Sequence, residues 1–181
     1  EAGTYGDVVE TIDDAVGDIL DTLERLEIED NTLIFFTSDN GPWFEGSSGN
    51  LRDRKGGTYL GGFQVPMLVR WPDRLPAGSE TSEMAMSIDL LPTIAAATGA
   101  TAPTDRTIDG RDILPVLEAG AATPHDVLFF FDGNDIVAAR NVDYRLVVKA
   151  FYRNYPVEFR NNPYLKWLEP LLFDMKIDPA E

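Results

Sequence analysis

The sequence predicts an α/β fold, with a mixed-sheet domain over residues 1–120 and a small antiparallel α+β subdomain over residues 125–181. Two observations carry this prediction. An amphipathic helical repeat is followed by a short turn and a continuous apolar run, which is the element order of an α/β domain. After residue 124, short β-prone runs alternate with tight turns, which predicts an antiparallel meander. A hydrophobic content of 44% is enough for a packed core and argues against wholesale disorder.

The helical repeat comes first in the chain. Apolar residues recur at three- and four-residue steps over residues 5–26, and Thr4 followed by Asp7 provides a helix start. A turn at residues 30–31 leads into residues 32–37, a run that is apolar on both faces. Such a run is typical of a strand covered on both sides, so we expect it to be buried in a sheet.

Residues 39–62 form a long loop rich in glycine and polar residues. Long loops inside compact domains are usually functional or disordered. The elements expected after this loop are one strand and two helices, over residues 65–71, 84–98 and 113–117. Within the first of these helices, Pro92 either kinks the helix or starts a new one.

The character of the sequence changes near residues 118–125, where we place the boundary of the second domain. Tight turns separate three strand-like runs, Val127–Phe131, Ile136–Arg140 and Tyr144–Ala150. We expect a helix over residues 161–167 and a last strand over residues 171–173. The subdomain is therefore predicted to be antiparallel, and truncated at Glu181.

The composition excludes several classes of site. There is no cysteine, so disulfides, thiolate catalysis and zinc–thiolate sites are ruled out. His125 is the only histidine, which rules out multi-histidine metal sites. The net charge of −16 repels nucleic acid and anionic membranes at long range. No apolar run approaches the roughly 20 residues that a membrane helix needs.

The first candidate site is the segment Ser38-Asp39-Asn40-Gly41, which follows the predicted buried strand. Sites in open α/β sheets form beyond the carboxyl ends of strands. Asp39 offers a carboxylate and Asn40 an amide oxygen, both hard ligands suited to calcium or magnesium. An ordinary Asx turn would account for the same residues. Two ligands are also fewer than the roughly six to eight oxygens that calcium binds.

The second candidate site is the loop over residues 51–62, which combines three cations with several glycines. Glycine lets the backbone approach a ligand closely, and cations hold an anion such as a sulfate or phosphate ester. The cations are Arg52, Arg54 and Lys55. A flexible, solvated loop would have the same composition.

Two further features favour ordinary structural roles. His125 follows a proline at the predicted boundary, and no serine or aspartate forms a catalytic relay with it in sequence, so we expect a surface or capping residue. Asp13 and Asp14 are neighbours on a helix and point about 100° apart, which prevents convergence on one ion.

Nine short segments occur along the chain, and their combination in this order is far more specific than any one of them alone. They are Tyr5-Gly6-Asp7, Ile12–Gly17, Asp30-Asn31-Thr32, Phe36–Pro42, Arg54–Pro66, Arg70-Trp71-Pro72, Ser87–Thr93, Asp109–Asp112 and Leu172–Glu181. The series spans nearly the whole chain and resembles the sulfatase family of the alkaline-phosphatase-like superfamily. The resemblance implies the carboxyl-terminal part of such a domain.

The resemblance implies roles for three residues. In sulfatases the Asp-Asn pair after the strand binds a divalent cation, usually calcium, which implies that Asp39 and Asn40 are metal ligands, for Ca²⁺ or Mg²⁺. The lysine of the Lys-Gly-x-Thr-Tyr-x-Gly-Gly segment contacts the sulfate group, which implies a catalytic role for Lys55. The family's formylglycine nucleophile arises in a Cys/Ser-x-Pro-x-Arg motif, which this chain lacks. Family order places that motif before Glu1, so we expect a longer natural protein.

The implied function of the intact protein is hydrolysis of a sulfuric ester by an arylsulfatase-like enzyme, and this chain alone is expected to be inactive. The expected partner is a small-molecule or glycan sulfate ester, with no nucleic acid and no membrane span, in the periplasm or outside the cell. Two alternatives stay open. One is a phosphodiesterase or phosphonate monoester hydrolase of the same superfamily, and the other is a non-catalytic sulfatase-like protein that binds anionic glycans.

Overall fold

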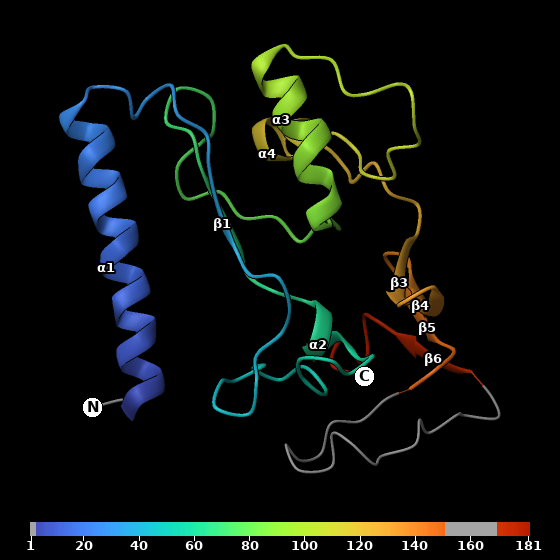
Figure 1. The fold of residues 1–181 in the computed structure, drawn as a ribbon. Helices are drawn as coiled ribbons and strands as arrows, with labels where there is room; N and C mark the ends of the chain where they lie inside the picture. The colour runs from blue at the N-terminus through green and yellow to red at the C-terminus, as the bar shows by residue number, and fades with distance from the viewer. Residues whose placement is uncertain (1–2, 151–169) are drawn as a thin grey trace.

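The computed structural model describes residues 3–150 and 170–181 (Figure 1). The elements of the first part are helix α1 (Gly3–Arg25), strand β1 (Ile34–Thr37), the short helix α2 (Leu60–Phe63) and strand β2 (Met67–Arg70). Strands β1 and β2 pair antiparallel, with Phe35 opposite Val69. The long helix and both strands predicted from the apolar pattern are confirmed.

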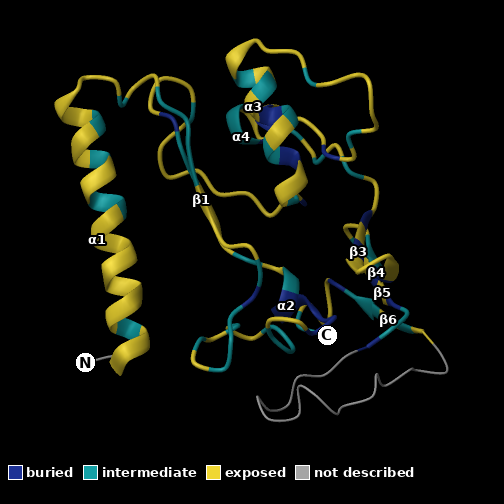
Figure 2. Cartoon of the chain, in the orientation of Figure 1, coloured by how far each residue is buried: buried dark blue, intermediate teal, exposed yellow. Residues whose placement is uncertain are grey.

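The prediction that residues 32–37 are buried in a covered sheet is wrong for this structure. Within the described residues β1 pairs with β2 alone, and Phe36 and Leu68 remain 39% and 66% exposed. Helix α1 lies to the side of this ribbon and has no buried residue (Figure 2). An apolar run favours burial, but burial itself depends on neighbouring layers that the described residues do not supply.

A group of helical segments follows β2. These are the 3₁₀ turn η1 (Ser87–Asp89), helix α3 (Leu90–Thr98) and helix α4 (Leu114–Ala119). Pro92 lies in the first turn of α3, where a missing N–H costs no helical hydrogen bond, so a new helix starts here. Gly99 and Gly120 end α3 and α4 in the left-handed conformation that glycine adopts without strain.

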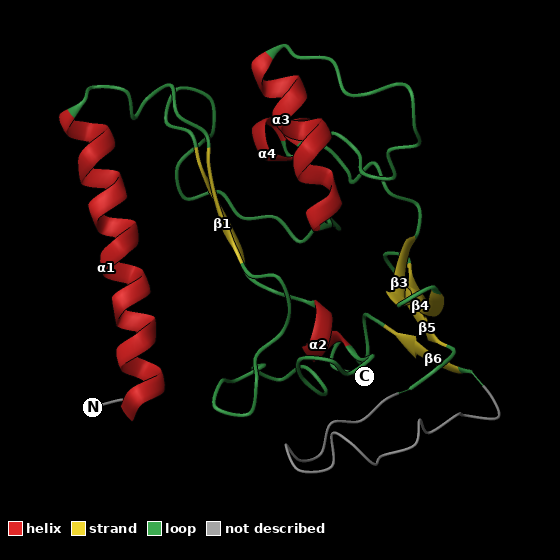
Figure 3. Ribbon diagram, viewed as in Figure 1, coloured by secondary structure: helices red, strands yellow, loops and turns green. Residues whose placement is uncertain are grey.

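The second part of the chain is the predicted antiparallel meander (Figure 3). Its strands are β3 (Leu128–Asp132), β4 (Asp135–Arg140), β5 (Tyr144–Val147) and β6 (Leu171–Asp174). They lie side by side in chain order, and every neighbouring pair is antiparallel. This confirms the three predicted strands and the last strand. The helix predicted over residues 161–167 lies outside the described residues.

The main buried cluster joins the meander to the glycine-rich loop. Its buried members are Tyr59, Leu60, Met84, Leu128, Phe130, Val137, Ala138, Val147, Ala150 and Met175. Phe63 of α2 meets Phe130 of β3 edge to face, with ring centroids 5.1 Å apart. The loop before α2 is therefore packed on the sheet formed by the last part of the chain. The division into domains at residues 118–125 stays a prediction.

Candidate functional site

Backbone hydrogen bonds join the two loops in which the sequence predicts chemistry. The N–H of Gly41 donates to the carbonyl oxygen of Gly62 at 2.9 Å. The N–H of Lys55 donates to the carbonyl oxygen of Pro42 at 3.0 Å. These two contacts place Lys55 next to the segment that begins with Asn40, although the residues are far apart in sequence.

The loops approach so closely that a side chain would not fit at two glycines. A Cβ on Gly41 would lie 1.8 Å from the carbonyl oxygen of Gly61. A Cβ on Gly61 would lie 2.3 Å from the carbonyl oxygen of Asp53. The glycines that suggested close approach to a ligand thus serve a close approach of backbone to backbone in this structure.

The side chains of Asp39 and Asn40 offer oxygen atoms at the end of β1. Asp39 is exposed and Asn40 is half-buried. The hydroxyl of Ser38 donates to the carbonyl of Asn40 at 3.0 Å and makes a long contact of 3.5 Å with Asp39 Oδ1, so this segment is also a hydrogen-bonded turn. In the part of the chain that the structure describes, the side chains of Asp39 and Asn40 have no closer hydrogen bond.

These two oxygens suit a hard divalent cation. The fit is partial, because no group of three or more His, Cys, Asp or Glu side chains that could hold a metal lies within residues 3–150 and 170–181. Calcium takes roughly six to eight oxygen ligands. Asp39 and Asn40 would therefore supply a minority of the coordination shell.

Lys55 is exposed, and no carboxylate among the described residues forms an ion pair with its ammonium group. The next residue, Gly56, has a φ of 79°, a conformation that strains any residue with a Cβ. The backbone thus turns directly after Lys55. An exposed ammonium and two oxygen ligands on loops that are hydrogen-bonded to each other are groups that can bind an anionic ester together with a cation.

Arg52 and Arg54 are both engaged in packing, because each guanidinium lies against an aromatic ring. The guanidinium of Arg52 lies 4.1 Å from the ring centroid of Tyr59, and its Nη1 donates to the carbonyl of Glu181 at 3.2 Å. The guanidinium of Arg54 lies 4.8 Å from the ring of Phe44. Of the three cations, Lys55 is the one that stands clear of aromatic rings and carboxylates in the described structure.

A buried ion pair connects the loop to the end of the chain. Arg145 Nη1 pairs with Glu181 Oε1, and both side chains are fully buried. The N–H of Leu60 donates to Glu181 Oε2 at 2.7 Å, and Arg145 Nη2 donates to the carbonyl of Thr58 at 2.6 Å. Burial raises the pKa of the Glu181 carboxyl, against the opposing effect of Arg145. Burial likewise lowers the pKa of the Arg145 guanidinium.

Sequence reasoning missed this pair, although one signal was present. Arg145 and Val147 are two residues apart in β5 and therefore lie on the same face of the strand. Val147 belongs to the core. A charged residue on the core face of a strand requires a buried partner. The pattern therefore indicates a partner for Arg145, while its identity as Glu181 depends on the fold.

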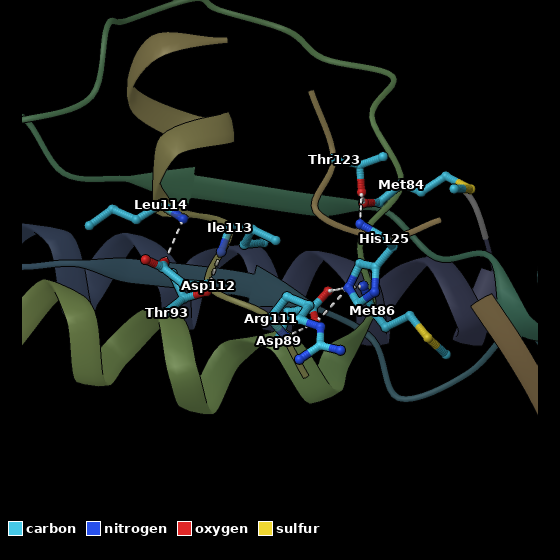
Figure 4. A network of polar contacts seen from close by, with 10 residues as sticks. All are labelled: Met84, Met86, Asp89, Thr93, Arg111, Asp112, Ile113, Leu114, Thr123 and His125. Atoms are coloured by element: carbon cyan, nitrogen blue, oxygen red, sulfur yellow. Dashed lines mark hydrogen bonds and ion pairs between the residues drawn. The ribbon is translucent and has the colours of Figure 1, made fainter. Parts of the chain in front are cut away.

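His125 also differs from expectation. Its side chain is 7% exposed, and Nε2 lies 2.8 and 2.9 Å from the two carboxylate oxygens of Asp89 (Figure 4). Asp89 in turn accepts the backbone N–H groups of Met86 and Arg111. Of the two expected roles, surface residue or capping residue, the surface role is wrong, because the imidazole is buried against the carboxylate of Asp89, the last residue of η1. This buried network does not touch residues 51–62 by any hydrogen bond in the described structure.

Family models and curated relatives match the chain over nearly its whole length. The family model described as Sulfatase matches residues 1–100, and the model described as N-sulphoglucosamine sulphohydrolase, C-terminal, matches residues 55–181. The chain is 38% identical to rat (Rattus norvegicus) steryl-sulfatase over 99% of its length and 36% of the relative. It is 36% identical to bovine (Bos taurus) arylsulfatase A over 99% of its length and 38% of the relative. The chain thus spans little more than a third of these curated relatives.

Solved structures show the same likeness in three dimensions. The PsFucS1 sulfatase from Pseudoalteromonas sp. superposes with a TM-score of 0.86 at 27% identity, covering 96% of this chain and 36% of that one. Ps i-CgsB in complex with k-i-k-neocarrahexaose superposes with a TM-score of 0.78 at 30% identity, covering 98% of this chain and 37% of that one. These matches confirm the predicted α/β fold of the alkaline-phosphatase-like type, and with the family-model matches they show that the chain belongs to the sulfatase family.

Proposed function

We propose that the protein is a sulfuric ester hydrolase of arylsulfatase type, and that Asp39, Asn40 and Lys55 form part of its site. The observation that carries this proposal is the pair of backbone hydrogen bonds, Gly41 to Gly62 and Lys55 to Pro42, which brings the three side chains into neighbouring loops. Membership of the sulfatase family supports the reaction class.

Each residue has a distinct chemical task in this proposal. Asp39 and Asn40 would hold a divalent cation, Ca²⁺ or Mg²⁺, which when bound would neutralise charge on a sulfuryl group. Lys55 would place its ammonium against the sulfuryl oxygens, as a mobile point charge with three donors. The nucleophile, a formylglycine by family resemblance, has no counterpart among these residues, so the chain alone is proposed to be inactive.

The proposed substrate is a small-molecule or glycan sulfate ester. The neocarrahexaose complex of Ps i-CgsB and the steryl-sulfatase relatives support both kinds of substrate. The described residues contain no helix that is both long and apolar enough to cross a membrane. The net charge of −16 disfavours nucleic acid as a partner. We propose a periplasmic or extracellular location from the same family relation.

The test compares ester classes in the full-length enzyme. We expect hydrolysis of 4-nitrophenyl sulfate and little hydrolysis of bis(4-nitrophenyl) phosphate. Asp39→Ala should weaken the divalent-cation dependence of the rate, whereas Asp13→Ala, an exposed carboxylate on α1, should not. Preference for the phosphate diester, or no turnover of either ester, would contradict the proposal.

A further inference from the structure

Two buried polar side chains, Arg145 and Glu181, bind the glycine-rich loop over residues 51–62. The Glu181 carboxylate accepts the N–H of Leu60 with one oxygen and pairs with Arg145 through the other. Arg145 divides its guanidinium between Glu181 and the carbonyl of Thr58. Both side chains are fully buried, so neither is able to touch a substrate.

Two further contacts fasten the other end of the same loop. The N–H of Arg52 donates to the carbonyl of Ala180 at 3.1 Å, and the N–H of Gly61 donates to the carbonyl of Arg52 at 2.8 Å. The guanidinium of Arg52 stacks on Tyr59, which belongs to the buried core. Residues 52 and 58–61 are thus held on both sides of Lys55, which itself is exposed.

The loop needs such fastening because of its composition. Four of the residues in 55–62 are glycines, and glycine loses more conformational entropy on ordering than any other residue. A buried ion pair adds little net stability compared with apolar packing, but it fixes geometry when every donor and acceptor is aligned. Arg145 and Glu181 satisfy backbone groups of the loop that apolar side chains would leave unpaired.

We propose that Arg145 and Glu181 are positioning residues, which hold the loop over residues 52–61 so that the Lys55 ammonium faces the sulfuryl group. This inference rests on the proposed function. It assigns β5 and the segment after β6 a part in the site, although the buried side chains of Arg145 and Glu181 do not reach the substrate. The pair acts through Lys55, and its effect on catalysis disappears when Lys55 is absent.

The first arm of the test measures the loop itself, by amide hydrogen exchange in the full-length enzyme. The reporters are backbone N–H groups with defined acceptors, at Gly57, Leu60, Gly61 and Gly62. Glu181→Gln and Arg145→Met should speed the exchange of these amides by about tenfold or more, because the free energy of local opening of the loop becomes smaller. His125→Gln breaks another buried pair without touching this loop, so it should leave these amides unchanged.

The second arm measures whether the pair acts through Lys55. Glu181→Gln should lower kcat by about tenfold with KM within about threefold, as expected when a contact of the transition state is lost. In a Lys55→Ala background the same substitution should change kcat by less than about twofold, because residues that act as a unit are not additive.

The results that would overturn a positioning role for Arg145 and Glu181 differ from the result that would overturn the proposed sulfatase activity. Unchanged exchange at the loop amides overturns the positioning role, and so does a kcat loss that is equally large with and without Lys55, since that marks a general structural role. Faster exchange with an unchanged kcat also overturns it. If wild-type enzyme cleaves no sulfate ester, the proposed function fails, while the exchange arm still decides whether the pair holds the loop.

Discussion

At the scale of single residues, Lys55 is the side chain on which the proposed chemistry depends most. In the full-length enzyme, Lys55→Ala should lower kcat by about 10²–10³, or ~2.7–4 kcal/mol, since it removes one charged donor from a developing anion. The folded state should be unaffected, because the side chain is exposed. Steady-state rates on 4-nitrophenyl sulfate give the measurement.

Arg54→Ala is the matched control, because its guanidinium stacks on Phe44 in the same loop region. It should cost at most a modest fraction of the Lys55 effect on kcat, consistent with the small energies of exposed cation–π contacts. Rates of all variants within a few-fold of wild type would show that Lys55 is a surface residue.

Tyr59 provides a prediction on pH. Burial raises the pKa of its phenol above the ordinary value of about 10. Between the unfolded and folded pKa values the folded chain holds a proton that the unfolded chain has released, so stability falls as pH rises above about 10. The phenolate absorbance that Tyr59→Phe removes from the folded protein should therefore develop above pH 10. A step at or below that pH would contradict the burial argument.

Single residues were the least predictable level of this structure. The sequence shows that Asp39, Asn40 and Lys55 have side chains suited to binding a cation or an anion. Whether their loops lie close together depends on hydrogen bonds between the loops, which the sequence does not show. His125 is followed by Asp126 in the sequence, yet its partner is Asp89, which lies 36 residues away. A local pattern contains no information on such distant contacts, which arise from the packing of elements.

At the scale of elements, the contact between the two loops sets a limit on side-chain size. Gly41→Ala places a Cβ against a backbone oxygen, so the loops must separate, and we expect a loss of about 1–3 kcal/mol in the free energy of unfolding. Gly17→Ala is the matched control: its Cβ meets nothing within 4 Å, and it lies inside α1. It should stabilise by roughly 0.5–1 kcal/mol.

Denaturant unfolding of both variants measures these changes in the full-length enzyme. Equal effects of the two substitutions would mean that the loops are not in contact in solution. A gain in kcat with Gly41→Ala would also contradict the idea that this contact holds the site together.

Elements were more predictable than residues, because their signals are local. The 3.6-residue repeat located α1, and the turn at Gly133, with a φ of 59°, marks the hairpin between β3 and β4. Burial was less predictable. The apolar run at β1 is as hydrophobic as a covered strand, yet the described residues leave Phe36 39% exposed.

At the scale of the whole molecule, the chain should bind calcium weakly and turn over no sulfate ester when isolated. Asp39 and Asn40 leave most of a calcium shell to water, so titration calorimetry should detect no micromolar binding. Incubation of the purified chain with 4-nitrophenyl sulfate should give the buffer rate. Micromolar binding that Asp39→Ala removes would show that further ligands lie within the chain, and turnover would show that the nucleophile does.

The hydrogen bond from Leu60 to Glu181 joins residues 121 positions apart. The ribosome therefore synthesises the loop over residues 52–61 long before Glu181, whose carboxylate accepts a hydrogen bond from that loop. Because synthesis proceeds at about 5–20 residues per second, several seconds pass between the synthesis of the loop and that of Glu181. Contacts of such long range form late, since their closure entropy is large. The loop over residues 52–61 would thus reach its final hydrogen-bonded arrangement only after Glu181 has been synthesised, well after its own residues.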